Sequence, residues 1–257
     1  MAIFKRLFDF YIQSSIHVGI AVLSLVCITV FSNDLGKHIV YLICVFFGTV
    51  LGYNLLKYYD VILTKLFTVK NHLALFTVTI LAGIGFLCCF LYLKQAIQIS
   101  LIEVGFLVLV YPFLRKYGLF KIFLVSFCVA IITVYIPFLT TKFLTLDFYI
   151  TFLQRFLIVI SWLIPFEILD SKTDSFELNT IPQQYGIKKA KLFGILLVIP
   201  FIVLEFLKTN YSYSVMSIGI ITVLFINFSS LKRNEYYTSF WVESIPIFWL
   251  GLLFLFS

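Results

Sequence analysis

Three carboxylates of this chain, Glu167, Asp170 and Asp174, stand at the spacing i, i+3, i+7. On a continuing helix this spacing places all three on one face. Like charges so close together repel, and the C-terminal end of a helix favours cations over acids. Mg²⁺ would relieve the repulsion, since it typically takes one or two carboxylates together with phosphate oxygens and water. The pattern therefore predicts a cation site, against the alternative of a solvated acidic helix end that Lys172 partly neutralises.

A second polar group occurs much earlier in the chain. Asn54, Lys57 and Tyr58 share one helical face near the end of an apolar stretch, and Lys65 follows them. Amide and ammonium groups donate hydrogen bonds that suit phosphate oxygens. If this group faces the acidic cluster, it would hold the phosphate end of a substrate. The alternative is a positively charged membrane anchor with interfacial tyrosines, which needs no ligand.

Arg155 lies in an apolar segment, twelve residues before Glu167. Ionisable groups inside a membrane usually face a cavity or a partner. Arg155 is therefore interpreted either as a substrate contact or as a member of a structural pair, for example with Glu103. The structural interpretation is slightly favoured.

The composition sets the environment of these residues. Of the 257 residues, 62% are hydrophobic and only 12% are charged, and the mean hydropathy is +1.08. Soluble domains are about 25% charged, so an ordinary soluble enzyme, a disordered chain and a free nucleic-acid binder are excluded. An integral membrane protein of one domain, residues 1–257, is the expectation.

Long unbroken apolar runs predict helices, because backbone polar groups in lipid must be satisfied within the chain. We expect an all-α membrane protein with about nine membrane-spanning helices, at residues 12–31, 38–58, 72–93, 96–114, 118–139, 148–169, 192–207, 211–229 and 240–256. The stretch 1–11 alternates apolar and charged residues and is predicted to be an interfacial helix before the first span. No small-residue cleavage site marks it as a signal peptide.

The basic residues predict the orientation of these spans. With the N-terminus in the cytoplasm, 14 of the 19 Lys and Arg residues fall on the cytoplasmic side and four on the other side. Such a bias is typical of membrane proteins with several spans, and we expect a multi-pass protein of the inner (cytoplasmic) membrane. The two longest cytoplasmic loops, 59–71 and 170–191, follow the second and sixth spans, so both polar groups are expected at the same membrane face.

These features together resemble the UbiA superfamily of intramembrane prenyltransferases. Glu167-x-x-Asp170-x-x-x-Asp174, followed by Thr180-Ile181-Pro182 and Gly186, is similar to that family's second aspartate-rich motif, D-x-x-D-x-x-x-D, with its downstream Thr-Leu-Pro segment. Glu167 stands in place of the first aspartate. The helix pattern extends the resemblance over the whole chain.

The first family motif, N-D-x-x-D-x-x-x-D, is not preserved. Aligned on Asn54, its aspartate positions fall on Leu55, Tyr58 and Ile62, and Lys57 stands inside the motif. In the family, both motifs bind Mg²⁺ ions that bridge a prenyl diphosphate. Here either Lys57 neutralises diphosphate in place of a second metal, or catalysis has been lost.

The resemblance implies a UbiA-like bundle around a central cavity that opens to the cytoplasm. It implies Mg²⁺-assisted transfer of a prenyl group from an isoprenyl diphosphate to an aromatic or lipid acceptor within the bilayer, with no nucleic-acid partner. Aromatic side chains would shelter the carbocation. Catalysis and metal binding would fall to Glu167, Asp170 and Asp174, and substrate binding to Asn54, Lys57, Tyr58, Lys65, Arg155, Lys172 and Thr180.

Two other functions remain open. The first is a catalytically degenerate relative that binds an isoprenoid lipid or serves in a membrane complex. The second is an unrelated transporter, which the position of both polar groups at one face disfavours, since transporters place such groups near the midplane.

Overall fold

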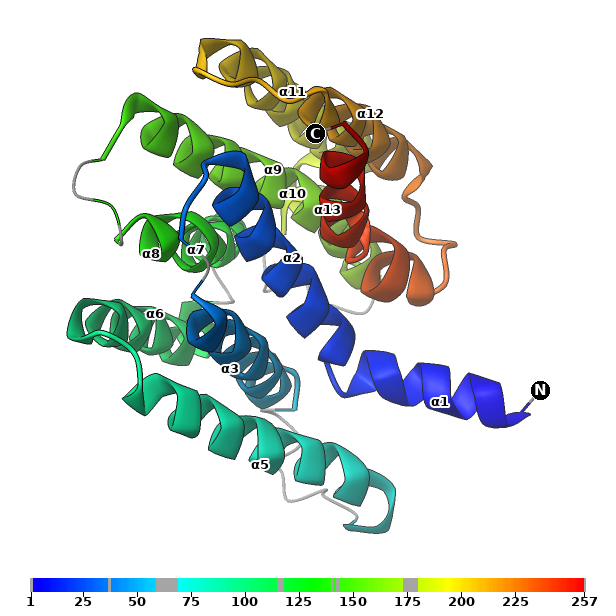
Figure 1. Ribbon diagram of the computed structural model, residues 1–257. Helices are drawn as coiled ribbons and strands as arrows, with labels where there is room; N and C mark the ends of the chain where they lie inside the picture. The colour runs from blue at the N-terminus through cyan, green and yellow to red at the C-terminus, as the bar shows by residue number, and fades with distance from the viewer. Residues whose placement is uncertain are drawn as a thin grey trace.

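The computed structural model describes residues 2–36, 38–58, 69–114, 118–139, 141, 144–172 and 180–256. Within these ranges every regular element is helical (Figure 1). In chain order the elements are α1 (Ala2–Gln13), α2 (Ile16–Ser32), α3 (Ile39–Lys57), α5 (Val69–Leu91), α6 (Gln95–Leu114), α7 (Gly118–Ala130), the π-helical η1 (Ile131–Tyr135), α8 (Ile136–Phe138), α9 (Leu146–Asp170), α10 (Ile181–Tyr185), α11 (Ile187–Val203), the 3-10 turn η3 (Leu204–Leu207), α12 (Tyr213–Phe228), the π-helical η4 (Tyr237–Val242) and α13 (Ile245–Phe256).

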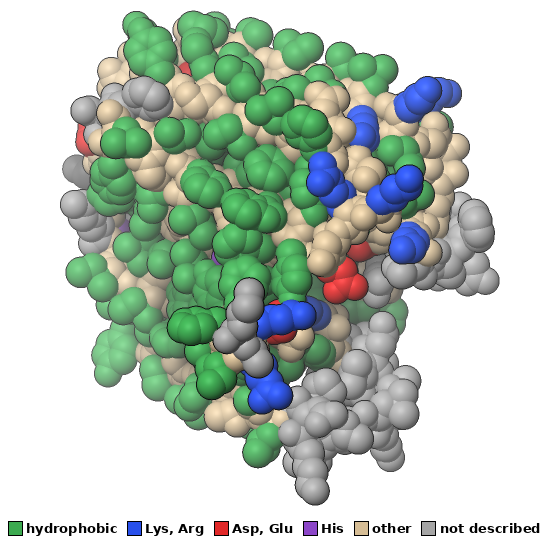
Figure 2. All heavy atoms as spheres, turned by 90° about the vertical axis from the view of Figure 1, so that its right-hand side faces the viewer, with side chains coloured by type: hydrophobic (Ala, Val, Ile, Leu, Met, Phe, Trp, Pro, Cys, Tyr) green, Lys and Arg blue, Asp and Glu red, His purple; other side chains and the backbone are tan. Residues whose placement is uncertain are grey.

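The helices are those of an integral membrane protein. Seven of the described helical segments are long and apolar enough to cross a membrane, the bent pair α1 and α2 would add an eighth, and α12 is a shorter apolar helix. Each predicted span overlaps one of these segments. Large apolar side chains such as Leu91 and Leu109 are more than two-thirds exposed, and Figure 2 shows hydrophobic side chains over most of one face. This surface suits contact with lipid.

Two predicted boundaries were wrong. The first span, expected at 12–31, is interrupted by a 56° bend, so that α1 forms a separate helix and α2 begins at Ile16. The separate N-terminal helix itself was predicted. The span expected at 192–207 begins earlier, at Ile187, because the lysines before Leu192 form the first exposed turn of α11 rather than a loop.

The helices pack mostly in chain order. α2 contacts α3 and α13, and contacts continue through α3–α6, α6–α7, α7–α9, α9–α11, α11–α12 and α12–α13, while α5 packs on α3. Figure 1 shows α2 crossing between the α3–α5–α6 group and the group formed by α9, α11, α12 and α13. The largest of the apolar clusters lies between α2 and the second group and includes Leu25, Ile158, Phe201 and Trp249.

The break between α1 and α2 is held by α3. Ser15 adopts a left-handed backbone conformation (φ 60°), and its hydroxyl donates to Asn54 Oδ1 at 2.6 Å. Asn54 Nδ2 donates to the Ser14 carbonyl at 3.1 Å and to Thr79 Oγ1 at 3.0 Å. Helix breaks at membrane depth leave backbone groups that neighbouring helices must satisfy, and Asn54, only 1% exposed, does this here.

The close approach of α9 and α11 generates a stability prediction. A Cβ at Gly194 would lie 3.0 Å from Ile164 Cγ1 and 3.1 Å from Ile226 Cδ1. Small residues at helix interfaces permit such packing, so Gly194→Leu should lower stability by about 1–3 kcal/mol through overpacking. Gly105→Leu is the matched control, since nothing lies within 4 Å of its Cβ position. Thermal unfolding in detergent measures both, and equal midpoints for the two variants would contradict this packing.

Candidate functional site

A buried ion pair joins α7 to α9. Lys121 Nζ lies 2.5 Å from Glu167 Oε1, and the two residues are only 8% and 2% exposed. Removing charges from water is costly, so each of these groups depends on the other. The first carboxylate of the predicted cation cluster is therefore already paired with an ammonium group.

Asp170 is the last residue of α9 and is exposed. It lies about one turn beyond Glu167 and interacts electrostatically with Lys121 and with Tyr53. Lys172 follows the helix end and is exposed. Asp174, the third predicted carboxylate, lies outside the described residues, as does Lys65. Within the described part, no group of three His, Cys, Asp or Glu residues is placed to hold a metal ion.

A second charged group lies between α3 and η4. Tyr53 donates its hydroxyl hydrogen bond to Glu243 Oε1 at 3.2 Å, and the exposed Lys57 interacts electrostatically with Glu243 and Glu235. Glu243 directly follows the π-helical turn η4, a type of irregularity frequent at functional sites. This arrangement places the Glu243 carboxyl group beside Tyr53 of α3. In α3 itself, other residue types stand where the first family motif has aspartates.

The two groups belong to one polar region, which we call the α3–α9 end because Lys57 and Asp170 are the last residues of these helices. The electrostatic interaction of Asp170 with Tyr53 connects them. Figure 2 shows basic side chains gathered in one half of the visible face with acidic side chains among them. Ammonium groups and carboxylates from α3, α7, α9 and η4 thus belong to one region of the structure.

Two other side chains at this end that were predicted to bind substrate form hydrogen bonds to backbone carbonyl groups. Asn54 uses its amide on the α1–α2 break, as described above. Tyr58 donates its hydroxyl hydrogen bond to the Gln13 carbonyl at 2.9 Å, and burial raises the pKa of its phenol. Both side chains therefore fix α1 against α3.

Thr180 begins the short helix α10. Its backbone N–H donates to Gln183 Oε1 at 3.1 Å, as in a capping box, and the residue is 1% exposed. Ile181 packs with Ile164 and Ile168 of α9, and Gly186 (φ 81°) ends α10 and leads into α11. The Thr-Ile-Pro segment thus returns the chain to α9 next to the acidic helix end.

Arg155 lies elsewhere. Twelve residues correspond to about 18 Å along a helix, so it stands far from the Glu167 carboxylate. Its Nη2 donates to Thr29 Oγ1 at 3.1 Å, and its guanidinium lies over the Trp249 ring at 5.0 Å. The suggested pairing with Glu103 was wrong, because Glu103 is exposed on α6 and no ion pair joins these two described residues.

Lys121, Glu243 and Tyr53 were missed as site residues. No motif marks them, but one signal was present: Lys121 and Glu243 are charged residues within predicted spans, and such residues usually face a cavity or a partner. Their partners lie far away in sequence, so pairing required the fold.

Comparison with known proteins tests the architecture. No family model and no curated protein sequence matches this chain. A solved structure of a UbiA homolog from Archaeoglobus fulgidus bound to GPP and Mg²⁺ is similar over 96% of this chain and 98% of that chain, with a TM-score of 0.64 and 10% identity. The fold is UbiA-like. A likeness at 10% identity establishes the fold alone. The expected all-helical UbiA-like bundle is confirmed.

The Lys121–Glu167 pair in this UbiA-like bundle generates a prediction. Lys121→Met removes the ammonium group that neutralises the buried Glu167 carboxylate and should cost about 3–5 kcal/mol of stability. The double variant Lys121→Met with Glu167→Met removes both charges and should recover much of that loss. Thermal unfolding of the single and double variants forms the double-mutant cycle.

The exposed Lys189 supplies the control, and Lys189→Met should leave the unfolding midpoint unchanged. Additive losses in the cycle would mean that Lys121 and Glu167 do not stabilise one another.

Proposed function

We propose that the α3–α9 end binds a prenyl diphosphate and that the chain transfers its prenyl group to a hydrophobic acceptor within the membrane. The observation that carries the proposal is a combination of fold and charge. The UbiA-like bundle is shared with a protein bound to GPP and Mg²⁺, and in this chain lysines and carboxylates from four helical elements meet where α3 and α9 end.

The α9 side suits one Mg²⁺ ion. Asp170 is exposed at the helix end, and Asp174 stands four residues further along the sequence. Two carboxylates with diphosphate oxygens and water form an ordinary Mg²⁺ ligand set, and a bound ion would neutralise part of the charge on the leaving diphosphate. The α3 side does not suit a second ion, since Leu55, Tyr58 and Ile62 stand where the family has aspartates.

Lys57 replaces the missing metal on the α3 side in this proposal. It is exposed at the end of α3, and it interacts electrostatically with Glu243 and Glu235. An ammonium group there would bind diphosphate oxygens and stabilise them as the allylic C1–O bond breaks and its electron pair moves to oxygen. The acceptor then bonds to C1 and loses a proton.

The Lys121–Glu167 pair favours a second candidate function. A carboxylate already neutralised by lysine contributes less to metal binding, and the α3 side lacks aspartates altogether. A chain with both changes would bind an isoprenoid lipid or diphosphate without ionising it. The two functions differ in one observable, which is the release of diphosphate.

Diphosphate release from a panel of prenyl diphosphates of increasing chain length tests the proposal, using purified protein and Mg²⁺. The wild type should release diphosphate, and chelation of Mg²⁺ should abolish the release. Asp174→Asn should reduce the rate by about 100-fold or more, because it removes a charged ligand from the reacting diphosphate. Asp34→Asn is the matched control, since Asp34 is exposed beyond the C-terminus of α2.

The outcomes of this assay separate the candidates. Saturable binding of prenyl diphosphate without release would establish the second function and contradict the first. Absence of both binding and release would contradict both.

Lys57 carries a prediction of its own. Lys57→Gln should weaken prenyl diphosphate binding by roughly 10- to 100-fold, the usual value of a hydrogen bond to a charged group. The measurement is the affinity for a non-reactive thiodiphosphate analogue, with the exposed Lys189→Gln as the control. Equal affinities for the two variants would remove Lys57 from the binding site.

A further inference from the structure

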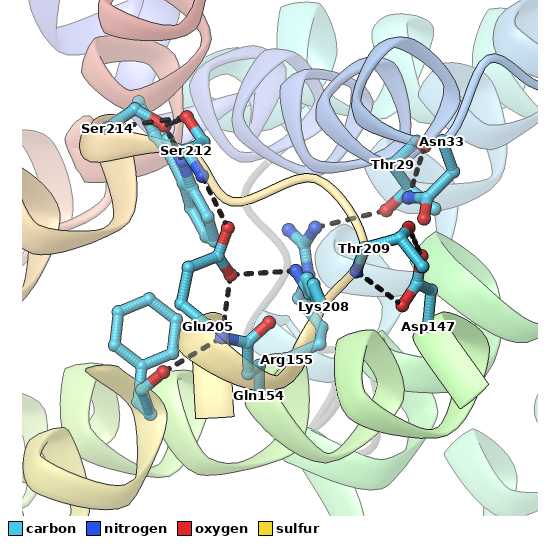
Figure 3. A network of polar contacts seen from close by, with 12 residues as sticks. Thr29, Asn33, Asp147, Gln154, Arg155, Glu205, Lys208, Thr209, Ser212 and Ser214 are labelled. Atoms are coloured by element: carbon cyan, nitrogen blue, oxygen red, sulfur yellow. Dashed lines mark hydrogen bonds and ion pairs between the residues drawn. The ribbon is translucent and has the colours of Figure 1, made fainter. Parts of the chain in front are cut away.

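A second buried polar cluster lies away from the α3–α9 end. It joins the C-terminal end of α2, the first half of α9, η3 and the beginning of α12 (Figure 3). The function proposed above for the α3–α9 end makes no use of it. Its central member is Arg155, which is 2% exposed.

The guanidinium of Arg155 is only partly satisfied. Nη2 donates to Thr29 Oγ1, whereas Nε and Nη1 are buried and have no hydrogen-bond partner among the described residues. A buried cation without a counter-charge is strongly disfavoured. The Trp249 ring beneath it offers a cation–π contact, which accepts no hydrogen bond from Nε or Nη1.

The carboxylate that lines the same space, Glu205, already binds other donors. Glu205 Oε2 lies 2.9 Å from Lys208 Nζ and accepts from Gln154 Nε2 at 2.9 Å, while Oε1 accepts from the Ser212 N–H at 2.8 Å. Glu205 thus balances Lys208, and none of these contacts of Glu205 is made to Arg155.

Lys208 adds to the imbalance. Burial lowers the pKa of Lys208, the carboxylates of Glu205 and Asp147 oppose this effect, and repulsion from Arg155 lowers the pKa further. Figure 3 shows Arg155 next to Lys208, with Glu205 on one side, while Asp147 is bound to Thr209. Two cations and one carboxylate therefore line the same space.

These side chains surround a small cavity. Arg155, Lys208, Thr29, Ser212 and Trp249 are among the residues that line it, and it reaches the surface beside the exposed Ser32. It has room for roughly one water-sized occupant. The space is small, which favours a small ligand, and a neutral water molecule would leave the charge of Arg155 without a counter-charge.

We propose that this cavity is an anion site that binds chloride, held by Arg155 with Lys208 beside it. Chloride is a compact monatomic anion, only somewhat larger than a water molecule, and it would accept from the Nε and Nη1 groups of Arg155 that have no hydrogen-bond partner. The site is independent of the proposed prenyl transfer, so either proposal can fail without the other. Its expected role is structural, because the ion would tie α2 and α9 to the η3–α12 turn.

The unfolding temperature of the wild type in detergent tests this proposal. Gluconate is exchanged for chloride at constant ionic strength, and a saturable rise of about 2–4 °C is expected from binding to the folded state alone. Bromide should act like chloride. Stabilisation by phosphate or acetate but not by chloride would overturn the assignment, since it would identify an oxyanion or a lipid headgroup as the ligand.

Arg155→Gln should abolish the chloride-dependent rise, whereas the exposed Lys189→Gln should retain it. If Arg155→Gln does not fold, chlorine NMR on the wild type decides the matter. Binding should broaden the chloride line, and bromide should reverse the broadening. Absence of both the temperature rise and the broadening, or a rise of equal size in Arg155→Gln, would overturn the proposal.

Discussion

Lipid offers neither a hydrogen bond nor a counter-charge, so each polar side chain inside this bundle must be matched by another part of the same chain. The matches link helices that are distant in sequence. Asn54 of α3 satisfies the break between α1 and α2, and Lys121 of α7 neutralises Glu167 of α9. Where the match is incomplete, as at Arg155, a ligand is the natural means of completing it.

The same requirement separates the two ends of the bundle. At the α3–α9 end, exposed groups such as Lys57 and Asp170 are accessible to a ligand, while the buried groups behind them are paired. At the other cluster the charges are enclosed and the space is small. A large, highly charged diphosphate suits the first environment, and a single small anion suits the second.

Much of the architecture follows from the sequence, because long apolar runs in a membrane have few alternatives to helices. The acidic residues at the end of α9 and the Thr180-Ile181-Pro182 segment could also be found in the sequence, since both are local patterns. Contacts between residues that are distant in sequence could not be predicted. Lys121 and Glu243 are marked only as charges inside spans, and their partners depend on how α7, α9, η4 and α3 meet.

The interpretations of Asn54 and Arg155 changed because the contacts of both side chains come from segments that are distant in sequence. Asn54 was assigned to substrate binding from its place in a motif, but its hydrogen bonds connect it to the break between α1 and α2. This break could not be predicted, because it falls inside an uninterrupted apolar run of the sequence. Arg155 was given Glu103 as a structural partner because both are ionisable groups in spans. The fold instead directs Glu103 outward and Arg155 towards Thr29 and Trp249.

The most direct test of the central claim is an experimental structure with a non-reactive prenyl thiodiphosphate and Mg²⁺. The account predicts that the diphosphate group lies between Lys57 and Asp170, with one metal ion on the α9 side and none on the α3 side. A diphosphate bound elsewhere, or a second ion held by α3, would contradict it.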